Sequence, residues 1–561
     1  MRRPIGVLLL LAGIAGGAPG GSKAWKGEER RLGAEETRYW RDLTGRLPQT
    51  FIDFRAELEK ADAKPDDHKE ATHDYAPWRK LYDDYLALAR ERGKADLALA
   101  TSGDEKALPL LFDELLDLCK RIDALDAEIE EARPKVRYYV FEPRLGIERT
   151  GLARRLAALI EALAQCPASA PFLAGEGWKR GEKADGRSSV TRRVALLDTL
   201  ARTDNEQARL AIEDQLVARS TSIRVAAVEA LARLRAAPRA PLAPLLADPS
   251  PIVRRALLQA VRAHAAGDGS WIEPVLAAWE GATGQLRDEC VLTLGALTNQ
   301  KFGHDRAKWK EWFEIYREEI AGGSFDAARI EVQEATPAPA AGGLSFYGRT
   351  ILASGVVFVL EGTQFVAMPA DWEVQRTEYR DKWPGLRTQW EEKWPSHWIV
   401  LQREMAATLE AMPKEMPYGI VTLGNIFVAQ TAPERGLFSP GPSSSKQALK
   451  LIERMPLRGW CSQFEGIRVA ARMGGLDPAQ AVDLPEPKID TIVLLGPGDP
   501  AGGCTMTPEA TVEAFRRFNR FRRLVVHTIR TNNEKEASEI LMRGLAEASG
   551  GTYAWQSKPP G

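Results

Sequence analysis

The C-terminal part of the chain contains a short, uninterrupted run of β-branched and other apolar residues. Val356 to Leu360 contains no polar residue, and Gly355 and Gly362 lie on either side of the run. A strand buried on both faces of a sheet has this pattern. Similar runs at residues 418–423, 426–429, 489–495 and 524–529 predict further strands. Because helical stretches separate the runs, we expect right-handed crossovers and a mostly parallel, doubly wound α/β sheet within residues 344–561.

The order of these segments resembles that of a von Willebrand factor A (VWA) domain. Phe346-Tyr347-Gly348 precedes the first strand, as a tyrosine–glycine pair does in many bacterial members. Gly550-Gly551-Thr552-Tyr553 resembles the approach to the family's final strand. The resemblance covers residues 344–556 and implies a Rossmann-type fold in which loops at the carboxyl end of the sheet usually grip a divalent cation.

The positions that hold this cation in the family are altered here. They correspond to Glu361, Thr363, Phe365, Cys461 and Pro497. Mg²⁺ prefers oxygen ligands in a near-octahedral arrangement, and neither Phe365 nor Pro497 supplies a side-chain oxygen. The Cys461 thiol suits softer metals. We therefore expect a degenerate site with no metal and no other cofactor; the alternative is a residual cation site that recruits the neighbouring Ser462.

A tryptophan-rich insertion at residues 371–398 separates the first strand from the first helix of the VWA-like domain. Its tryptophans are Trp372, Trp383, Trp390, Trp394 and Trp398. Because the insertion leaves from the predicted metal face, these residues are candidates for a hydrophobic partner-binding surface, where tryptophan is enriched. The alternative is that they pack the core of an enlarged domain.

Residues 186–320 contain an internal repeat. Similar eight-residue motifs begin at Arg193, Arg224, Arg254 and Arg287, which are 31, 30 and 33 residues apart. Small and aliphatic residues at helical spacing with this period are typical of stacked helix pairs, and the segment resembles HEAT-like repeats of an α-helical solenoid. The arginines are predicted to pair with turn acids and carbonyls inside the solenoid; binding of an acidic ligand is the alternative.

The repeat is followed by two different segments. The spacing of Trp309, Trp312, Phe313 and Tyr316 predicts a capping helix that covers the apolar face of the last repeat. Residues 321–343, rich in Pro, Gly and Ala, are predicted to form a semi-flexible linker.

The N-terminal region divides into a predicted signal peptide at residues 1–24 and a helical segment at 25–185. Arg2 and Arg3 precede an apolar run from Ile5 to Ile14, which is short for a membrane span. We expect export to the periplasm, cell surface or exterior; an uncleaved anchor is the alternative. In the helical segment, a leucine and isoleucine stripe from Leu108 to Ile129 predicts one long amphipathic helix. We expect this segment to continue the helical array; a separate helical bundle and a partner-binding coiled coil are the alternatives.

Five cysteines are too few for a disulfide framework in a chain of 561 residues. Cys119, Cys166 and Cys290 occupy apolar helical positions and are predicted to be buried thiols. Cys461 and Cys504 fall on neighbouring loops of the VWA-like domain, where the resemblance allows a disulfide or two unpaired thiols.

Signals for catalysis and for nucleic-acid binding are weak. The six histidines form no metal-ligand spacing, and the chain has no nucleophile elbow or phosphate-binding loop motif. Lys and Arg (76) balance Asp and Glu (77), so no net field attracts a polyanion. The basic and aromatic segment Arg516–Arg523 is predicted to be a solvent-exposed helix face with a packed phenylalanine stripe.

The sequence therefore predicts a non-enzymatic, exported protein-binding scaffold. Its partner is predicted to be one or more proteins, not a nucleic acid, and no membrane span is expected after the signal peptide. The alternatives are a cation-dependent adhesion module and a hydrolase with an unrecognised site.

Overall fold

A computed structural model describes most of the chain in segments. The described residues are 21–41, 76–132, 143–166, 168–182, 187–203, 205–234, 242–265, 267–334, 343–362, 396–423, 429–455, 462–476, 487–498, 507–531 and 536–556. We refer to the elements up to residue 334 as the helical region and to those from residue 343 as the α/β region. Residues 1–20 lie outside the described part, so the signal peptide stays a prediction.

The helical region begins with a helix over residues 22–41. It continues through α2 (Ala76–Ala100), α3 (Ala107–Ala132), α4 (Pro143–Gln165), α5 (Ser169–Phe172), η3 (Leu173–Gly177), α6 (Trp178–Glu182), α7 (Arg187–Leu200), α8 (Glu206–Glu213), η4 (Asp214–Val217), α9 (Thr221–Arg233), η5 (Ala243–Ala247), α10 (Pro251–His264), η6 (Gly269–Trp271), α11 (Ile272–Trp279), α12 (Gly284–Thr298), α13 (Arg306–Ala321) and η7 (Ala327–Arg329).

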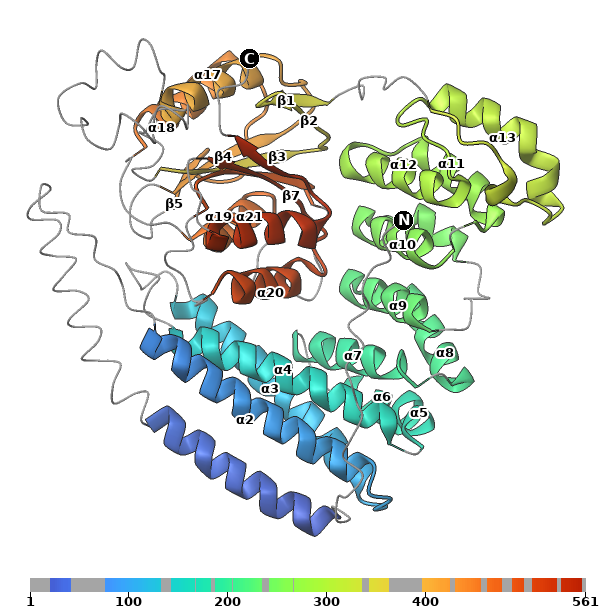
Figure 1. Cartoon of the computed structure of the whole chain (residues 1–561), viewed down its shortest axis with the longest axis vertical. Coiled ribbons are helices and arrows are strands. Elements are labelled where there is room, and N and C mark those ends of the chain that lie inside the picture. Colours follow the sequence, from blue (N-terminus) through green and yellow to red (C-terminus); the bar gives the residue numbers. More distant parts are fainter. Residues whose placement is uncertain are drawn as a thin grey trace, which may run out of the picture.

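The four repeated motifs lie on α7, α9, α10 and α12, and these helices pack one on the next (Figure 1). The preceding α3 and α4 pack on α7, so the N-terminal helices are continuous with the stack. The predicted stripe lies on α3, where Leu111, Leu115 and Leu118 are fully buried. Arg224 shows the predicted use of a repeat arginine: it donates to both carboxylate oxygens of Asp248, at 2.9 and 3.0 Å, and to the carbonyl of Ala218 at 2.8 Å.

The predicted capping helix is α13. Trp309, Trp312 and Phe313 are buried, and α13 packs against α11 and η6. The chain then stays in contact with the stack for longer than predicted, because Gln300 donates to the carbonyl of Glu331 at 3.2 Å and accepts from the Gln333 amide at 2.8 Å. Residues 322–334 therefore pack against the end of the helical region, and the part of the predicted linker at 335–342 lies outside the described residues.

The helix over residues 22–41 is held to α2, α3 and α4 by a buried polar cluster. The Trp25 indole donates to Asp96 at 3.0 Å, and Glu29 pairs with Arg155 at 3.0 Å. Arg155 also pairs with Glu114 at 2.5 Å. Burial raises the pKa of Asp96 to about 6; Arg155 and the Trp25 indole oppose this shift, whereas Glu29 and Glu114 support it.

We expect Asp96→Asn to stabilise the protein more at pH 7.5 than at pH 5. An acid whose pKa is raised in the folded state favours the protonated form, so its contribution to stability is complete below its ordinary value of 3.8 and is lost as the pH rises through about 6. Asparagine cannot ionise and keeps an oxygen for Trp25, so its advantage should grow with pH to about 1–3 kcal/mol. Thermal melts at both pH values measure it, with Glu105→Gln at an exposed position as control. An equal gain at both pH values would contradict the expectation.

Within the described residues, no single helix is both long and apolar enough to cross a membrane. The bent pair Leu145–Gln165 and Ser169–Gly181, with 113° between its halves, meets the length and composition criteria only when its halves are taken together.

The α/β region contains a two-stranded hairpin, a six-stranded sheet and flanking helices. Its elements are β1 (Leu344–Phe346), β2 (Arg349–Ile351), β3 (Val356–Glu361), α17 (His397–Glu410), β4 (Tyr418–Leu423), β5 (Ala429–Ala432), α18 (Pro442–Glu453), α19 (Gln463–Met473), β6 (Thr491–Gly496), α20 (Pro508–Asn519), β7 (Val525–Thr531), α21 (Glu536–Ser549) and β8 (Tyr553–Gln556).

The six-stranded sheet has the order β5-β4-β3-β6-β7-β8, in which only β5 is antiparallel to its neighbour. Numbered within the sheet, this order is 3-2-1-4-5-6, that of a doubly wound α/β fold. All residues of β3, β4 and β6 are buried, as their apolar runs predict. One face packs against α19 and α21 and the other against α17 and α18, so the sheet has helices on both sides (Figure 1).

Two features differ from the predicted strands. β5 begins at Ala429, where the predicted strand ends, and residues 424–428 lie outside the described part. The segment before the first strand forms the hairpin β1–β2, whose two turn residues, Tyr347 and Gly348, have φ values of 51° and 68°. Positive φ at both central positions is the geometry of a tight hairpin turn that matches strand twist.

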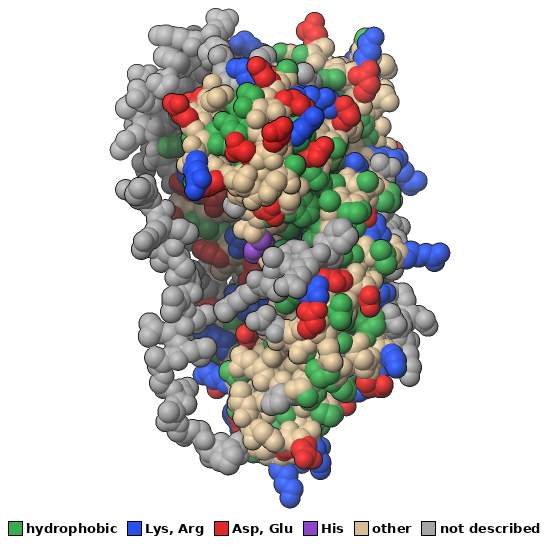
Figure 2. Space-filling view, turned by 90° about the vertical axis from the view of Figure 1, so that its right-hand side faces the viewer, with side chains coloured by type: hydrophobic (Ala, Val, Ile, Leu, Met, Phe, Trp, Pro, Cys, Tyr) green, Lys and Arg blue, Asp and Glu red, His purple; other side chains and the backbone are tan. Residues whose placement is uncertain are grey.

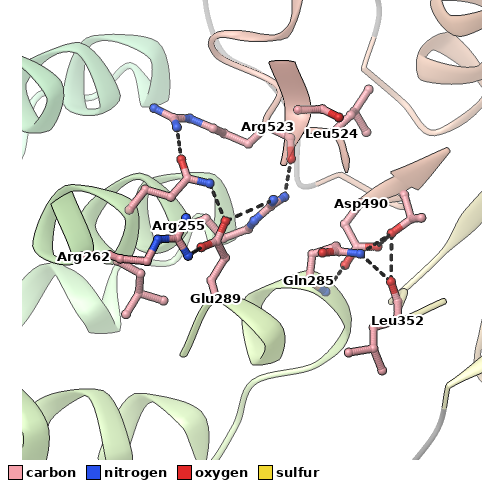
Figure 3. A network of polar contacts seen from close by, with 12 residues as sticks. Arg255, Arg262, Gln285, Glu289, Leu352, Asp490, Arg523 and Leu524 are labelled. Atoms are coloured by element: carbon pink, nitrogen blue, oxygen red, sulfur yellow. Dashed lines mark hydrogen bonds and ion pairs between the residues drawn. The ribbon is translucent and has the colours of Figure 1, made fainter. Parts of the chain in front are cut away.

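The helical region contacts the sheet at the amino ends of its strands (Figure 3). Asp490, just before β6, accepts from the Gln285 amide at the start of α12 at 2.8 Å and from the Ser354 amide, just before β3, at 3.0 Å. The Gln285 side chain donates to the Leu352 carbonyl at 2.6 Å. A carboxylate from one region thus caps a helix of the other, and the carboxyl ends of the strands lie at the opposite edge of the sheet.

Candidate functional site

The carboxyl edge of the sheet is organised around the buried side chain of Glu361. This residue ends β3 and is fully buried. One carboxylate oxygen accepts from the side-chain amide of Gln463, the first residue of α19, and the other accepts from the backbone amide of Gly498 at 2.8 Å. Glu361 therefore connects the end of β3 to the two further segments on which the VWA resemblance places metal ligands.

Gly496 makes room for this carboxylate. A β-carbon at position 496 would lie 2.1 Å from Oε2 of Glu361 and 2.5 Å from its Cβ, so no larger residue fits without displacing Glu361. Gly496 pairs with Arg530 of β7, which is also buried. The Arg530 guanidinium donates to Glu539 at 3.3 Å and lies 5.0 Å from the ring centre of Trp555. A buried acid and a buried base thus flank Gly496 along one row of the sheet.

The structure describes part of the predicted metal site. Pro497 is buried beside Gly498, and its ring offers no donor or acceptor to a cation. The Ser462 hydroxyl accepts from the Glu465 amide at 3.4 Å as the N-cap of α19, so its oxygen serves the helix. Thr363, Phe365 and Cys461 lie outside the described residues. Within the described ranges, no group of three or more His, Cys, Asp or Glu side chains is placed to hold a metal ion.

Of the five tryptophans predicted for partner binding, the structure describes Trp398. It lies in the first turn of α17, is half-buried and packs against the hydrophobic cluster between the sheet and α17–α18. This position fits the packing interpretation for Trp398. Trp372, Trp383, Trp390 and Trp394 lie outside the described residues, and their predicted role stays a prediction.

Cys119, Cys166 and Cys290 are buried and free, as predicted. Burial raises the pKa of the Cys119 and Cys290 thiols to about 12, so neither is ionised near neutral pH. These thiols are therefore poor nucleophiles and poor metal ligands. Cys461 and Cys504 lie outside the described residues, and the disulfide between them is untested.

The basic segment Arg516–Arg523 is only partly the solvent-exposed face that its composition predicts. Arg516 is exposed, and Phe518 and Phe521 pack against the core as expected. However, Arg520 and Arg523 bind side chains of the helical region that lie about 300 positions earlier in the chain. This part of the prediction was wrong because composition does not show which surface faces a distant acidic one.

Charge on the outer side of the stacked helices agrees with the balanced composition. Figure 2 faces that side and shows basic and acidic side chains interspersed over the described surface. No broad area of one charge is visible there that would attract a polyanion.

Sequence reasoning missed the hydrogen-bond partners of Glu361 and the contact between the two regions. Gln463 and the Gly498 amide have no signature, because an amide side chain and a main-chain N–H occur in every loop. Gln285 and Asp490 likewise stand alone in the sequence. The glycine preceding Gln285 was the one available signal, since a glycine at the start of a helix suits a close approach of another backbone.

Comparisons with known proteins add little to this geometry. No protein-family model matches the chain, and no curated protein matches it. A solved structure that is similar in part is the von Willebrand factor type A from Catenulispora acidiphila, with 11% sequence identity and a TM-score of 0.24. The alignment covers 37% of this chain and 40% of that chain. At this TM-score the likeness carries no weight, and the α/β fold rests on the strand order itself.

Proposed function

We propose that this chain is an exported, non-enzymatic protein-binding scaffold. In this proposal the helical region is a HEAT-like solenoid, and the α/β region is a VWA-like domain that works without a metal ion. The observation that carries the proposal is the hydrogen bonding of Glu361, whose two carboxylate oxygens already have partners within the protein.

The helical stack supports the HEAT-like interpretation. Four copies of one motif lie on four helices that pack in sequence order, and Arg224 pairs with the turn acid Asp248. The Asp248 carboxylate also accepts from the Ser250 amide at 2.8 Å, which fixes the turn before α10. A repeat whose recurring polar residues bind its own turns is suited to stacking.

The bonds of Glu361 support metal independence. In a cation-dependent domain, a carboxylate at this place would bind the ion directly or through water. Here it joins β3, α19 and Gly498 after β6 by hydrogen bonds instead, and in this proposal these bonds take the place of an ion.

The placement of the two regions supports the carboxyl edge as the partner-binding surface. The helical region covers the amino ends of β3, β6 and β7, whereas the insertion at residues 371–398 follows the carboxyl end of β3. We propose that this insertion contacts the partner protein through its tryptophans other than Trp398.

Magnesium should leave the melting temperature unchanged. A ligand present at 100 times its dissociation constant stabilises the native state by about 2.7 kcal/mol, which a thermal melt detects readily. We therefore expect identical melts in 10 mM Mg²⁺ and in EDTA, with Ca²⁺ and Mn²⁺ as further probes. A saturable rise in melting temperature that disappears in Glu361→Ala would instead favour the cation-dependent adhesion module.

Replacing Trp390 and Trp394 by Ala should abolish binding of a protein partner captured from the cell envelope while the melting temperature changes little. Tryptophans at the centre of an interface commonly contribute about 2 kcal/mol or more each, so the pair should weaken binding by at least about 100-fold. Trp398→Ala, at a half-buried packing position, is the matched control and should lower stability more than binding. Retained binding together with a lower melting temperature would assign the insertion to packing.

A further inference from the structure

The turn between α20 and β7 inserts two arginines among the helices of the helical region. Arg520 donates to both carboxylate oxygens of Asp198, at 2.7 and 2.8 Å, and to Glu229 at 2.8 Å. Arg523 donates to Glu229 and to the side-chain oxygen of Gln259. Bidentate contacts between a guanidinium and a carboxylate combine strong hydrogen bonds with strict geometry, and lysine cannot reproduce them.

The three acceptors occupy the same position of the repeat. Asp198, Glu229 and Gln259 are each the sixth residue of their motifs, which begin at Arg193, Arg224 and Arg254. They lie on α7, α9 and α10, which pack in that order and therefore present one side chain per helix along a single row. We call these three residues the acceptor row. In the fourth motif the same position is Leu292, which is 48% exposed and ends the row.

Each arginine donates hydrogen bonds to two neighbouring members of the acceptor row. Arg520 contacts the first and second members, and Arg523 contacts the second and third. Glu229 in the middle accepts from both arginines. An Arg-x-x-Arg spacing on a tight turn thus matches the distance between adjacent helices of the repeat.

The turn that carries these arginines is fixed by its own hydrogen bonds. The Asn519 side chain donates to the Leu524 carbonyl at 2.7 Å and accepts from the Leu524 amide at 2.9 Å. Arg522 faces away from the row, since its guanidinium lies 4.1 Å from the ring centre of Phe518. The Arg523 carbonyl also accepts from Arg255 of α10, which pairs with Glu289 of α12 at 3.8 Å (Figure 3). A turn preorganised in this way loses little entropy on binding.

The charges on the acceptor row and on the turn are complementary. Burial alone would raise the pKa of Asp198, but Arg520 and Arg233 together hold it below its ordinary value. Asp198 is therefore held as a carboxylate, and it would keep Arg233 but lose the bidentate contact with Arg520 if the turn withdrew.

We propose that the acceptor row is a binding surface for an Arg-x-x-Arg turn, and that residues 519–524 of this chain occupy it as an internal ligand. The repeat supplies the recognition by placing one polar acceptor on each helix, and the α/β region supplies the ligand. This inference is independent of the carboxyl edge and of metal binding.

The test uses the full chain and a fluorescent peptide of residues 516–524. In the wild type the tethered turn competes at an effective concentration in the millimolar range, so the free peptide should bind weakly. The double variant Arg520→Ala, Arg523→Ala removes that competitor and should bind the peptide at least about tenfold more tightly. A peptide with Ala at both arginine positions should not bind. Adding Asp198→Asn and Glu229→Gln to the double Ala variant should abolish binding of the unaltered peptide.

Arg516→Ala is the matched control, because Arg516 is exposed on the same segment and should leave peptide binding as in the wild type. Far-UV circular dichroism establishes that each variant folds. If the double Ala variant does not fold, Arg520→Gln with Arg523→Gln takes its place, because it removes both guanidinium groups but keeps a polar side chain at each position. Equal peptide binding by the wild type and the double Ala variant, or binding that survives the loss of Asp198 and Glu229, would overturn the proposal.

Discussion

Gly284→Ala should lower the free energy of unfolding by about 3–5 kcal/mol, because a β-carbon at this position collides with the α/β region. The added carbon would lie 2.2 Å from Oδ2 of Asp490 and 2.2 Å from the Ser354 amide nitrogen. The second contact is with backbone, so rotation of a side chain cannot relieve it. The start of α12 must move away, which breaks the 2.8 Å bond between the Gln285 amide and Asp490.

Gly303→Ala is a control that distinguishes the effect of this collision from the effect of backbone strain. Gly284 has a φ of 53°, a conformation that alanine adopts at a cost of its own. Gly303 has a φ of 55° but nothing within 4 Å of its ideal β-carbon. Gly303→Ala should therefore cost only the strain, about 1 kcal/mol. Urea unfolding of both variants measures the difference, and equal losses would mean that α12 yields to the added carbon without harm.

The parts of the fold that sequence predicted are those whose signal is local. Val356–Leu360 and the runs that became β4, β6 and β7 are continuous apolar segments, and burial on both faces leaves little freedom to misplace them. The predicted strand at 426–429 ended before β5 does, because Ala429–Ala432 includes polar residues at the edge of the sheet, where no burial pattern marks the end of the strand. The three-residue strands of the β1–β2 hairpin are too short to show a period.

The candidate site could be predicted only in outline. The family resemblance located Glu361 at the end of the first strand, and the loss of oxygen ligands at Pro497 could be read directly. The partners of Glu361 could not, because they depend on how three separate segments meet at one edge. The same holds for Arg520, whose two acids lie 322 and 291 positions earlier in the chain. Side-chain type indicates what a residue can bind, and the fold alone decides what it meets.

Glu361→Ala should lower the free energy of unfolding by about 2–4 kcal/mol, since each buried donor left without an acceptor costs about 1–3 kcal/mol. The variant leaves the Gln463 amide group and the Gly498 N–H without their acceptor, and it opens space above Gly496. Removal of a buried carboxylate offsets part of this loss, because burial of a charge is itself unfavourable. Glu361→Gln keeps one acceptor but turns its own NH₂ group toward a donor, so it should lose less than the Ala variant.

Glu404→Ala provides the matched control for urea unfolding and also sharpens what the result means. Glu404 is half-buried and accepts one bond, from the Tyr347 amide at 3.0 Å, so its loss should cost about 1 kcal/mol. A larger loss for Glu361→Ala than for this control would establish that the Glu361 carboxylate holds the three segments together, as a metal-independent domain requires. A neutral or stabilising effect would mean that the carboxylate is kept at the expense of stability. Residues at binding sites commonly behave in that way. That outcome would therefore favour the alternative function, a cation-dependent adhesion module.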